Sequence, residues 1–173
     1  FHEPNCRVGV WVVAEVHQGR LHPATIELIG AARVLAADLG VRVGVLCADS
    51  AGRALADECA AWGADSVYLP QAAPQEFDPV QYADICGAAI DRFRPQIALY
   101  AATPRGRLVA PMIAYSLYCG LTADCTELDI RIDADNGLKV LAQTRPALGG
   151  NIMATIISRH SFCQMATARP GVF

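Results

Sequence analysis

The sequence lacks the features that would identify many classes of protein at once. No apolar run reaches the roughly 18 residues of a membrane-spanning helix, and the first residues show no signal-peptide pattern. The motifs of glycine-rich dinucleotide loops, Walker loops, zinc proteases and serine hydrolases are all missing. The net charge is only −3 at pH 7, so nucleic-acid binding is not expected either.

Cysteine and histidine are present but show no ligand spacing. The seven cysteines are scattered without a Cys-x-x-Cys pair, so we interpret them as small buried side chains in a reducing cytoplasm. A metal or disulfide role is the alternative. The four histidines fall in predicted loops or near a terminus and are interpreted as solvated surface side chains. We therefore expect neither a metal site nor a catalytic residue in this chain.

What the chain does contain is enough apolar sequence for one buried core. It has 173 residues, of which 53% are hydrophobic and 18% charged. This balance is typical of a folded domain and excludes a disordered tail. The length favours one domain, so we interpret residues 1–173 as a single folded unit.

Short apolar runs alternate with amphipathic helical patterns over the first 118 residues. Continuous apolar runs fit parallel strands that are covered on both faces. Helix boundaries are indicated by Asp78–Pro79 at one start, by Gly40 at one end and by Ser50 as a cap of the second helix. The order predicts an α/β fold, a Rossmann-like three-layer sandwich with a mostly parallel sheet. The predicted strands are Val8–Ala14, Val41–Cys47, Ser66–Leu69 and Gln96–Ala101, and the last predicted helix covers about residues 105–118.

The pattern changes after residue 120. Two strand-like runs, Glu127–Ile132 and Leu138–Gln143, flank Asn136–Gly137, which is a strong hairpin signal. Ile152–Ile157 predicts another strand, and Gln164–Phe173 predicts a strand that leaves the domain into a turn. We expect this part to extend the sandwich at its carboxyl-terminal end.

One candidate site is the segment Thr103-Pro-Arg-Gly-Arg107, where a predicted strand meets the start of a helix. Ligands of α/β sheets bind beyond the carboxyl ends of the strands. Free backbone N–H groups and the positive end of the helix dipole favour an anion there, and two arginines add charge. Thr103, Arg105, Gly106 and Arg107 are thus candidates for a phosphate or partner-carboxylate site. The alternative is that both arginines are solvated and Gly106 merely permits the turn.

A second candidate is the segment Thr144-Arg-Pro-Ala-Leu-Gly-Gly-Asn151. The proline restricts Arg145 to an extended conformation, and Gly149 and Gly150 allow the backbone to approach a ligand closely. A guanidinium held in this way suits hydrogen bonding to a flavin ring or a phosphate. The alternative is a tight strand connection with an exposed arginine. Arg169-Pro-Gly171 has a similar pattern and is interpreted either in the same way or as a turn at the exit of the domain.

Four segments, taken in order, resemble the alpha subunits of electron-transfer flavoproteins. That family carries Thr-x-x-Gly-Arg-Asp-Leu-Ala-Pro, Gly-Leu-Thr-Ala-Asp-Cys, Thr-Arg-Pro-Ala-x-Gly-Gly-Asn and Gln-Met-Ala-Thr-Val-Arg-Pro-Gly. The sequence has similar segments at Thr103–Pro111, Gly120–Cys125, Thr144–Asn151 and Gln164–Gly171. Trp11–Glu15 is similar to the first strand of the electron-bifurcating branch. The resemblance spans essentially the whole chain.

The resemblance implies a function that the residues alone do not. Alpha subunits continue into a FAD-binding domain, which we expect beyond Phe173. Their first domain packs on a beta subunit that holds AMP or, in bifurcating members, a second FAD. By this resemblance Arg145 lies near that second flavin, together with Thr144, Gly149, Gly150 and Asn151. The intact heterodimer takes electrons from dehydrogenases or NADH and passes them on through FAD.

Three positions depart from the family pattern. Leu108 stands where the family has aspartate, Met112 replaces a common arginine, and Phe162–Cys163 replaces an arginine–proline pair. These changes concern charged surface contacts and not the fold. We expect a carrier subunit without catalysis of its own. Two alternatives stay open: an assembly platform that seats the beta subunit without touching a cofactor, and a domain that binds AMP or ATP through Thr103–Arg107.

Overall fold

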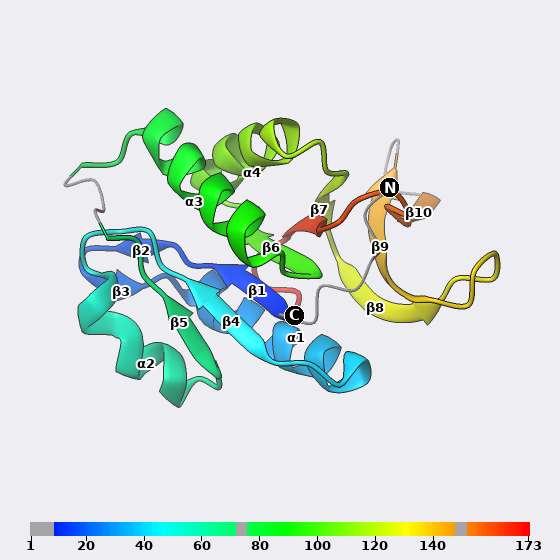
Figure 1. The fold of residues 1–173 in the computed structure, drawn as a ribbon, viewed down its shortest axis with the longest axis horizontal. Coiled ribbons are helices and arrows are strands. Elements are labelled where there is room, and N and C mark those ends of the chain that lie inside the picture. The colour runs from blue at the N-terminus through cyan, green and yellow to red at the C-terminus, as the bar shows by residue number, and fades with distance from the viewer. Residues whose placement is uncertain (1–8, 72–75, 148–151) are drawn as a thin grey trace.

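A six-stranded sheet forms the centre of the computed structural model, which describes residues 9–71, 76–147 and 152–173. The strand order is β5-β4-β1-β6-β11-β7, and neighbouring strands in it are parallel. Figure 1 shows this sheet between two layers of helices, which confirms the predicted α/β sandwich. The strands are β1 (Val10–Val13), β4 (Val43–Leu46), β5 (Ser66–Tyr68), β6 (Ile97–Ala101), β7 (Leu121–Cys125) and β11 (Gln164–Ala168).

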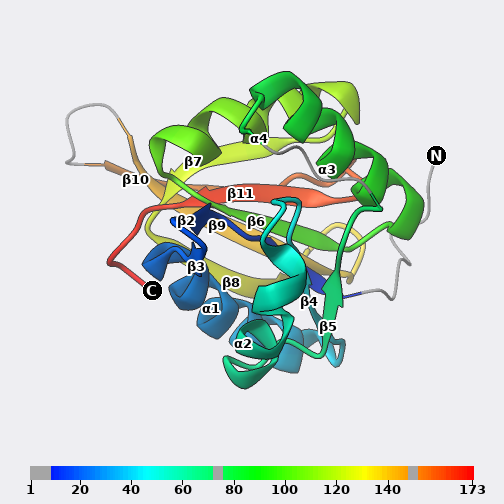
Figure 2. The ribbon, with the colours of Figure 1, turned by 90° about the vertical axis from the view of Figure 1, so that its left-hand side faces the viewer.

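Two helices cover each face of the sheet, as the side view in Figure 2 shows. The helices α1 (Pro23–Leu39) and α2 (Ala56–Ala61) pack on one face. The helices α3 (Pro79–Phe93) and α4 (Pro104–Ser116) pack on the other face. Because successive strand residues point to opposite faces, a strand covered on both sides must be apolar at every position. This is why the sequence shows continuous apolar runs and not alternation.

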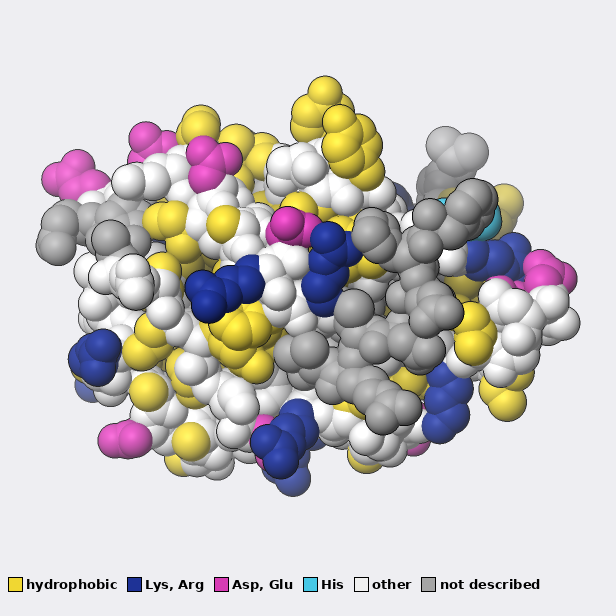
Figure 3. Space-filling model, in the orientation of Figure 1, with side chains coloured by type: hydrophobic (Ala, Val, Ile, Leu, Met, Phe, Trp, Pro, Cys, Tyr) yellow, Lys and Arg dark blue, Asp and Glu magenta, His cyan; other side chains and the backbone are white. Residues whose placement is uncertain are grey.

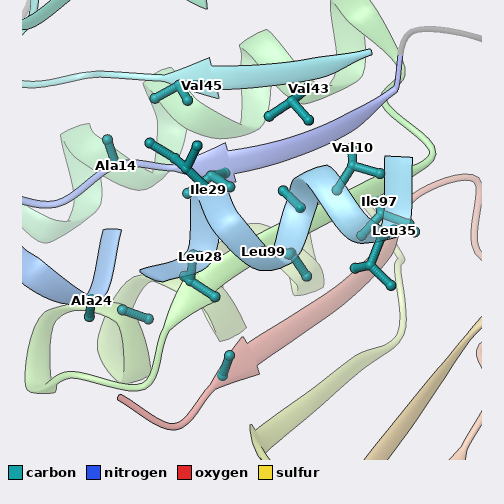
Figure 4. Packing of buried hydrophobic residues seen from close by; sticks show 14 of the residues in the cluster. Val10, Ala14, Ala24, Leu28, Ile29, Leu35, Val43, Val45, Ile97 and Leu99 are labelled. Atoms are coloured by element: carbon teal, nitrogen blue, oxygen red, sulfur yellow. The ribbon is translucent and has the colours of Figure 1, made fainter. Parts of the chain in front are cut away.

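The central strand β1 divides its side chains between the two faces. Val10 and Val12 belong to the core under α1, whereas Trp11 and Val13 belong to the core under α3 and α4. Each fully buried Leu, Ile or Val contributes roughly 1.5–3 kcal/mol of transfer free energy. Figure 4 shows the α1 side, where helix and strand residues meet: Leu28, Ile29 and Leu35 with Val10, Val43, Val45, Ile97 and Leu99.

Trp11 needs a glycine on the neighbouring strand. Its ring lies 4.1 Å from that of Tyr68 on β5, although β4 runs between β1 and β5. Gly44 of β4 makes this contact possible, because a Cβ there would lie 2.6 Å from the indole Cδ1 and Nε1. Phe93 of α3 completes the aromatic cluster, 5.7 Å from Trp11 between ring centroids. The cluster therefore ties the edge strand β5 to the middle of the sheet.

Side chains cap the starts of three helices. Asp78 accepts hydrogen bonds from two backbone N–H groups at 2.8 and 3.1 Å, and Pro79 follows as the first residue of α3, as predicted. His22 Nδ1 accepts a hydrogen bond from the N–H of Ala24 at 3.1 Å and so caps α1. The interpretation of His22 as a solvated side chain is therefore wrong. The cap of α4 belongs to the candidate site described below.

The predicted start of the second helix is also wrong. Ser50 does not cap it, because the chain first forms a 3₁₀ turn, η1 (Gly52–Leu55), and α2 begins only after that turn. The cysteines follow the prediction better. Of the six in the described part of the chain, five are buried and Cys119 is half-buried, which fits small core side chains. His17 and His160 are exposed, as expected, while His2 and Cys6 lie outside the described residues.

A smaller antiparallel sheet, in the order β10-β9-β8, packs beside α1. It consists of β8 (Glu127–Ile132), β9 (Lys139–Ala147) and β10 (Ile152–Ile156). The predicted hairpin is confirmed, and Gly137 in its turn has the positive φ of 70° that favours glycine. Leu141 joins the core under α1 and so anchors this sheet to the domain. A two-stranded hairpin of β2 (Val16–His17) and β3 (Arg20–Leu21) lies between β1 and α1 along the chain.

The strand predicted near the end of the sequence is confirmed as β11 (Gln164–Ala168). β11 is inserted between β6 and β7 and pairs with both in parallel. All five of its residues are buried, so its removal would open the middle of the sheet. The turn predicted at Pro170–Gly171 does follow the strand.

The end of the described chain is fastened to α1. Glu27 accepts hydrogen bonds from the N–H groups of Gly171, Val172 and Phe173 at 2.8, 2.7 and 2.6 Å. Partial burial raises the pKa of Glu27, but the three N–H groups outweigh it and lower the pKa overall. The chain therefore ends on the α1 side of the sheet, as Figure 2 shows.

We predict that Gly106→Ala destabilises the fold because the start of α4 lies directly on the end of β6. A Cβ at position 106 would lie 1.8 Å from the carbonyl oxygen of Ala101, a backbone atom that cannot move aside alone. Urea unfolding at pH 7 should show a loss of about 3 kcal/mol. The control Gly30→Ala meets nothing within 4 Å on α1 and should stabilise by about 0.5–1 kcal/mol. A Gly106→Ala protein as stable as the wild type would contradict this contact.

Candidate functional site

The carboxyl ends of β1 and β6 meet at the start of α4, where the strand order changes direction. This is the position at which α/β sheets bind ligands. Thr103 is buried there, and its Oγ1 accepts a hydrogen bond from the N–H of Gly106 at 3.0 Å. The same hydroxyl donates to Oε2 of Glu15, at the end of β1, at 2.6 Å. A carboxylate of the protein itself therefore already lies at the positive end of α4.

Arg105 turns into the protein. Its Nη2 donates to Oδ1 of Asp49 at 2.7 Å, and its guanidinium lies over the rings of Phe77 and Tyr82 at 4.2 and 4.3 Å. Burial raises the pKa of Asp49, and the hydrogen bond from Arg105 opposes that rise. The alternative in which Arg105 is solvated is therefore wrong. This ion pair joins the segment after β4 to the start of α4.

Little room remains beside Arg105. The hollow between it, β1, β6 and the adjoining helices has a volume of about 10 Å³, which is the space of roughly one water molecule. Val13, Tyr82, Tyr100 and Val109 are among the residues that line it. A nucleotide does not fit this hollow in the present conformation.

Arg107 and Arg169 meet at one carboxylate, that of Asp124 in β7. Arg169 donates through Nε and Nη2 at 3.2 and 2.7 Å, and Arg107 approaches through Nη2 at 3.3 Å. The hydrogen bond from Arg169 is the main reason why the pKa of Asp124 lies below its usual range. Arg107 also donates through Nε to the carbonyl of Ala102 at 2.8 Å. Both arginines are partly exposed, so each keeps one side toward solvent.

Asp124 is held in an unusual backbone conformation. Its φ is +61°, a region that a non-glycine residue rarely adopts. The register between β7 and β11 shifts at this point, and the N–H of Asp124 donates to Oγ1 of Thr167 at 2.8 Å. Such strained residues cluster at functional positions because the surrounding structure must hold them there.

Arg145 lies on β9, opposite Ala154 of β10, and is partly buried. Its charge reaches the same group, because it lowers the pKa of Asp124. Burial raises the pKa of Cys125 to about 11, and the charge of Arg145 opposes this rise. No side-chain hydrogen bond or ion pair joins Arg145 to another residue in the described ranges. Thr144 beside it is buried and shares a 2.9 Å hydrogen bond with Thr155.

The structure therefore brings some predicted site residues together and separates others. Arg107 and Arg169 donate hydrogen bonds to Asp124, and the charge of Arg145 also acts on this carboxylate, so three positive charges face one negative charge. Such a group attracts an anion or an electron-rich ring at the edge of the sheet. Arg105 belongs to the separate pair with Asp49. Gly149, Gly150 and Asn151 lie outside the described residues, so their role stays a prediction.

The sequence reading missed the acidic members of this region. Glu15, Asp49 and Asp124 were not proposed as site residues, yet each holds a predicted one in place. Their position was the available signal, because Glu15 and Asp49 follow predicted strands at the same edge of the sheet as Thr103. Asp124 lies in the Gly-Leu-Thr-Ala-Asp-Cys segment, and the resemblance of that segment to the family was the signal that could have identified it.

Two kinds of feature are absent from the described ranges. None of the helices there combines the length and the apolar character needed to cross a membrane. The described residues also contain no group of three or more His, Cys, Asp or Glu side chains that could hold a metal ion.

We predict that Asp124→Asn destabilises the protein in a pH-dependent way. A carboxylate whose pKa is lowered by folding stabilises the fold above its unfolded pKa of about 3.9, and this contribution is lost as the pH falls through the folded pKa. We expect a loss of about 1 kcal/mol at pH 7, which disappears toward pH 3, in urea unfolding. The control Asp129→Asn breaks an exposed pair with Arg131 and should cost less than about 0.5 kcal/mol. Equal losses for both variants, or a pH-independent loss, would contradict the role of Asp124.

Comparisons with known proteins give this geometry its context. An alpha subunit of the electron transfer flavoprotein of Megasphaera elsdenii is 40% identical over 168 residues, which are 95% of this chain and 48% of that protein. The corresponding subunit of Thermoanaerobacterium thermosaccharolyticum is 42% identical over 164 residues, 94% of this chain and 48% of that protein. The chain thus spans about half the length of these curated relatives.

A relative with a different name shares a smaller part of its own length. The lactate dehydrogenase (NAD(+),ferredoxin) subunit LctC of Acetobacterium woodii is 38% identical over 168 residues, 95% of this chain and 38% of that protein. The family model described as the electron transfer flavoprotein domain matches residues 10–173. The match includes Asp124, Arg145 and Arg169, and the family resemblance of the sequence is confirmed. This chain belongs to the electron transfer flavoprotein family, and its similarity is to the alpha subunits.

Proposed function

We propose that this chain is the amino-terminal domain of an alpha subunit that takes part in electron transfer, with Arg145 beside a flavin held by a beta subunit. One observation carries the proposal: Arg107 and Arg169 bind Asp124, while Arg145, whose charge acts on the same carboxylate, has no side-chain partner among the described residues. In the intact heterodimer, electrons from a dehydrogenase or NADH would pass onward through FAD. The chain itself would catalyse no reaction.

The residues of the site suit a flavin. When bound, a flavin supplies the electron transfer itself, and its ring gains negative charge on reduction. Asp124 engages Arg107 and Arg169, which leaves Arg145 as a guanidinium with free N–H donors among the described residues. A planar guanidinium can donate to ring carbonyl groups or stack on a ring face. The hydrogen bond between Thr144 and Thr155 joins β9, the strand that carries Arg145, to β10.

The assignment of cofactors follows the same proposal. One FAD belongs to the additional length that the relatives have beyond this chain's match, and the beta subunit carries either AMP or a second FAD. We propose the second case for Arg145, because the flavin ring gains negative charge on reduction and a guanidinium beside it would stabilise that charge. Thr144, Gly149, Gly150 and Asn151 are proposed to line the same contact.

We predict that Arg145→Gln lowers the reduction potential of the flavin in the beta subunit. Loss of the cation removes stabilisation from the reduced ring, and we expect a shift of about 60 mV, equivalent to a tenfold change in a one-electron equilibrium. The measurement is a spectroelectrochemical titration of the complete complex with its beta subunit.

The matched control is Arg131→Gln on β8, an exposed arginine of the same small sheet that pairs with Asp129. It should leave both flavin potentials within about 10 mV of the wild type, since a screened charge more than a Debye length of roughly 8 Å away acts weakly. If Arg145→Gln leaves both potentials unchanged while the complex stays intact, Arg145 does not lie beside a flavin.

A second candidate function is an assembly platform that seats the beta subunit without touching a cofactor. The exposed edge strand β10 favours it. Ile152, Met153 and Ile156 are exposed there, and no charged residue occurs in this strand. Unprotected apolar edge strands are natural sites of association.

We predict that Met153→Asp weakens association with the beta subunit at least tenfold and leaves the flavin potentials unchanged. The control Ile132→Asp changes an even more exposed apolar residue on β8, the opposite edge of the same sheet, and should bind like the wild type. Titration calorimetry provides the affinities. Loss of potential without loss of affinity would favour the flavin contact over the platform.

The test of the whole proposal is reconstitution. The chain is mixed with its cognate beta subunit, with and without FAD, and sedimentation is recorded together with flavin absorbance. A one-to-one complex with flavin travelling in it is the expected result. If no complex forms at micromolar concentration, the proposed role of this domain is wrong.

A further inference from the structure

A buried glutamine on β9 has no hydrogen-bond partner for its side chain. Gln143 is 0% exposed, and neither its Oε1 nor its Nε2 forms a hydrogen bond with any of the described residues. Taking an amide out of water without a hydrogen bond costs free energy, so buried amides of this kind are rare. Figure 3 shows charged side chains standing out at the surface of the molecule, where water solvates them, whereas Gln143 is shielded from solvent. The Gln143 amide therefore calls for a functional explanation.

Gln143 lies on the same face of β9 as Arg145, two residues before it. The side chains of a strand alternate between its two faces, and β9 pairs with β8 and β10 in a regular register. Leu141, on the same face, belongs to the core under α1. Leu141 and Gln143 are fully buried along this face, and Arg145 is partly buried. Gln143 thus lies between the core and the arginine.

The side chains of Gln143 and Arg145 are close enough to reach each other. Residues two apart in a strand are separated by about 6.5 Å, which an extended glutamine and an extended arginine span together. The guanidinium of Arg145 makes no side-chain hydrogen bond or ion pair within the described ranges. Arginine has five N–H donors and no acceptor, while Oε1 of glutamine is an acceptor. Each of the two groups therefore supplies what the other lacks.

We propose that Gln143 is a positioning residue for Arg145, whose guanidinium donates a hydrogen bond to Oε1 of Gln143 when a partner covers this edge of the domain. The inference rests on the proposed function, because it takes the guanidinium to lie beside a flavin in the complex. A covered guanidinium loses water, so its N–H groups that face the domain need an acceptor from the chain. Gln143 provides that acceptor from behind the arginine.

An uncharged acceptor suits this position better than a carboxylate. Asp124 already accepts hydrogen bonds from Arg107 and Arg169. A carboxylate on Arg145 would also offset the positive charge that stabilises a reduced flavin, whereas an amide leaves that charge in place. A donor that is held in position needs no reorganisation when negative charge develops beside it. Gln143 therefore raises the flavin potential only through Arg145.

A second buried glutamine has the contact expected of a structural amide. Gln164 of β11 is 5% exposed, and its Oε1 accepts a hydrogen bond from the N–H of Leu141 at 2.5 Å. This bond joins β11 to β9, so the Gln164 amide contributes to the fold of the domain itself. Gln143 has no contact of this kind in the part of the chain that the structure describes. The two glutamines are thus a matched pair for experiment.

Urea unfolding of the free chain tests whether the Gln143 amide is part of the fold. Gln143→Met keeps the length of the side chain and removes the amide, so the unfolding midpoint should stay the same or rise. Gln164→Met should lower the midpoint, because the N–H of Leu141 loses its partner. If Gln143→Met lowers the midpoint as far as Gln164→Met does, the amide is structural and the proposal is overturned.

Flavin potentials of the complete complex with its beta subunit test the coupling to Arg145. Gln143→Met should lower the potential of the flavin in the beta subunit by the equivalent of an about threefold change in a one-electron equilibrium, which is about 28 mV. In the Arg145→Gln protein the same substitution should cause no further change, because Gln143 acts only through the arginine. Gln164→Met should leave the potential unchanged.

The outcomes separate this inference from the proposed function. If Arg145→Gln lowers the potential and Gln143→Met does not, the flavin contact stands and the positioning role is wrong. The positioning role is also wrong if Gln143→Met causes the same shift with and without Arg145, since the amide then acts by another route. If neither substitution changes the potential, the proposed flavin contact is itself wrong, and the positioning role with it.

Discussion

Burial of the parallel sheet on both faces is the constraint on which the rest of this structure depends. All five residues of β6 and of β11 are buried, so these strands have no surface on which to carry functional side chains. Charged side chains can then reach solvent only where these strands end. Thr103 and Arg169 follow the two strands directly, and both meet carboxylates there. The position of the candidate site is thus a consequence of how the core is built.

The arginines near this edge are neutralised by carboxylates to different extents. Arg105 is matched by one carboxylate and two aromatic rings, so it stabilises the domain and offers little to a ligand. Around Asp124 the balance is unequal, because this carboxylate pairs with two arginines and the charge of Arg145 also acts on it. The group around Asp124 is the better candidate for binding a partner or cofactor, since its positive charge is neutralised only when an anion or an electron-rich ring binds. Both segments were candidates by their spacing, and only the contacts separate Arg105 from Arg107, Arg145 and Arg169.

Local patterns predicted most of the fold, and long-range pairing explains where they failed. The apolar runs of the first four parallel strands, the Asp78 cap and the Asn-Gly hairpin depend on neighbouring residues and were predicted correctly. The place of β11 depends on a partner more than 60 residues away, so an apolar strand near the end could not reveal that it fills the middle of the sheet. Arg105 failed for the same reason, because its carboxylate lies 56 positions earlier in the chain. The resemblance to a family supplied what local patterns lacked for Arg145, whose position near a flavin stays a prediction.

The contact between Trp11 and Tyr68 across Gly44 has an optical consequence. The chain has two tryptophans, and their environments are opposite: Trp11 is fully buried, whereas Trp62 at the end of α2 is 48% exposed. Fluorescence from Trp11 should therefore lie at short wavelength and resist aqueous quenchers, while that of Trp62 should lie at long wavelength and be quenched readily. Loosening of the edge strand β5 would expose the indole of Trp11 before the remainder of the sheet separates. Because Gly44 allows Trp11 to reach Tyr68, the fluorescence of Trp11 should report whether the sheet is intact.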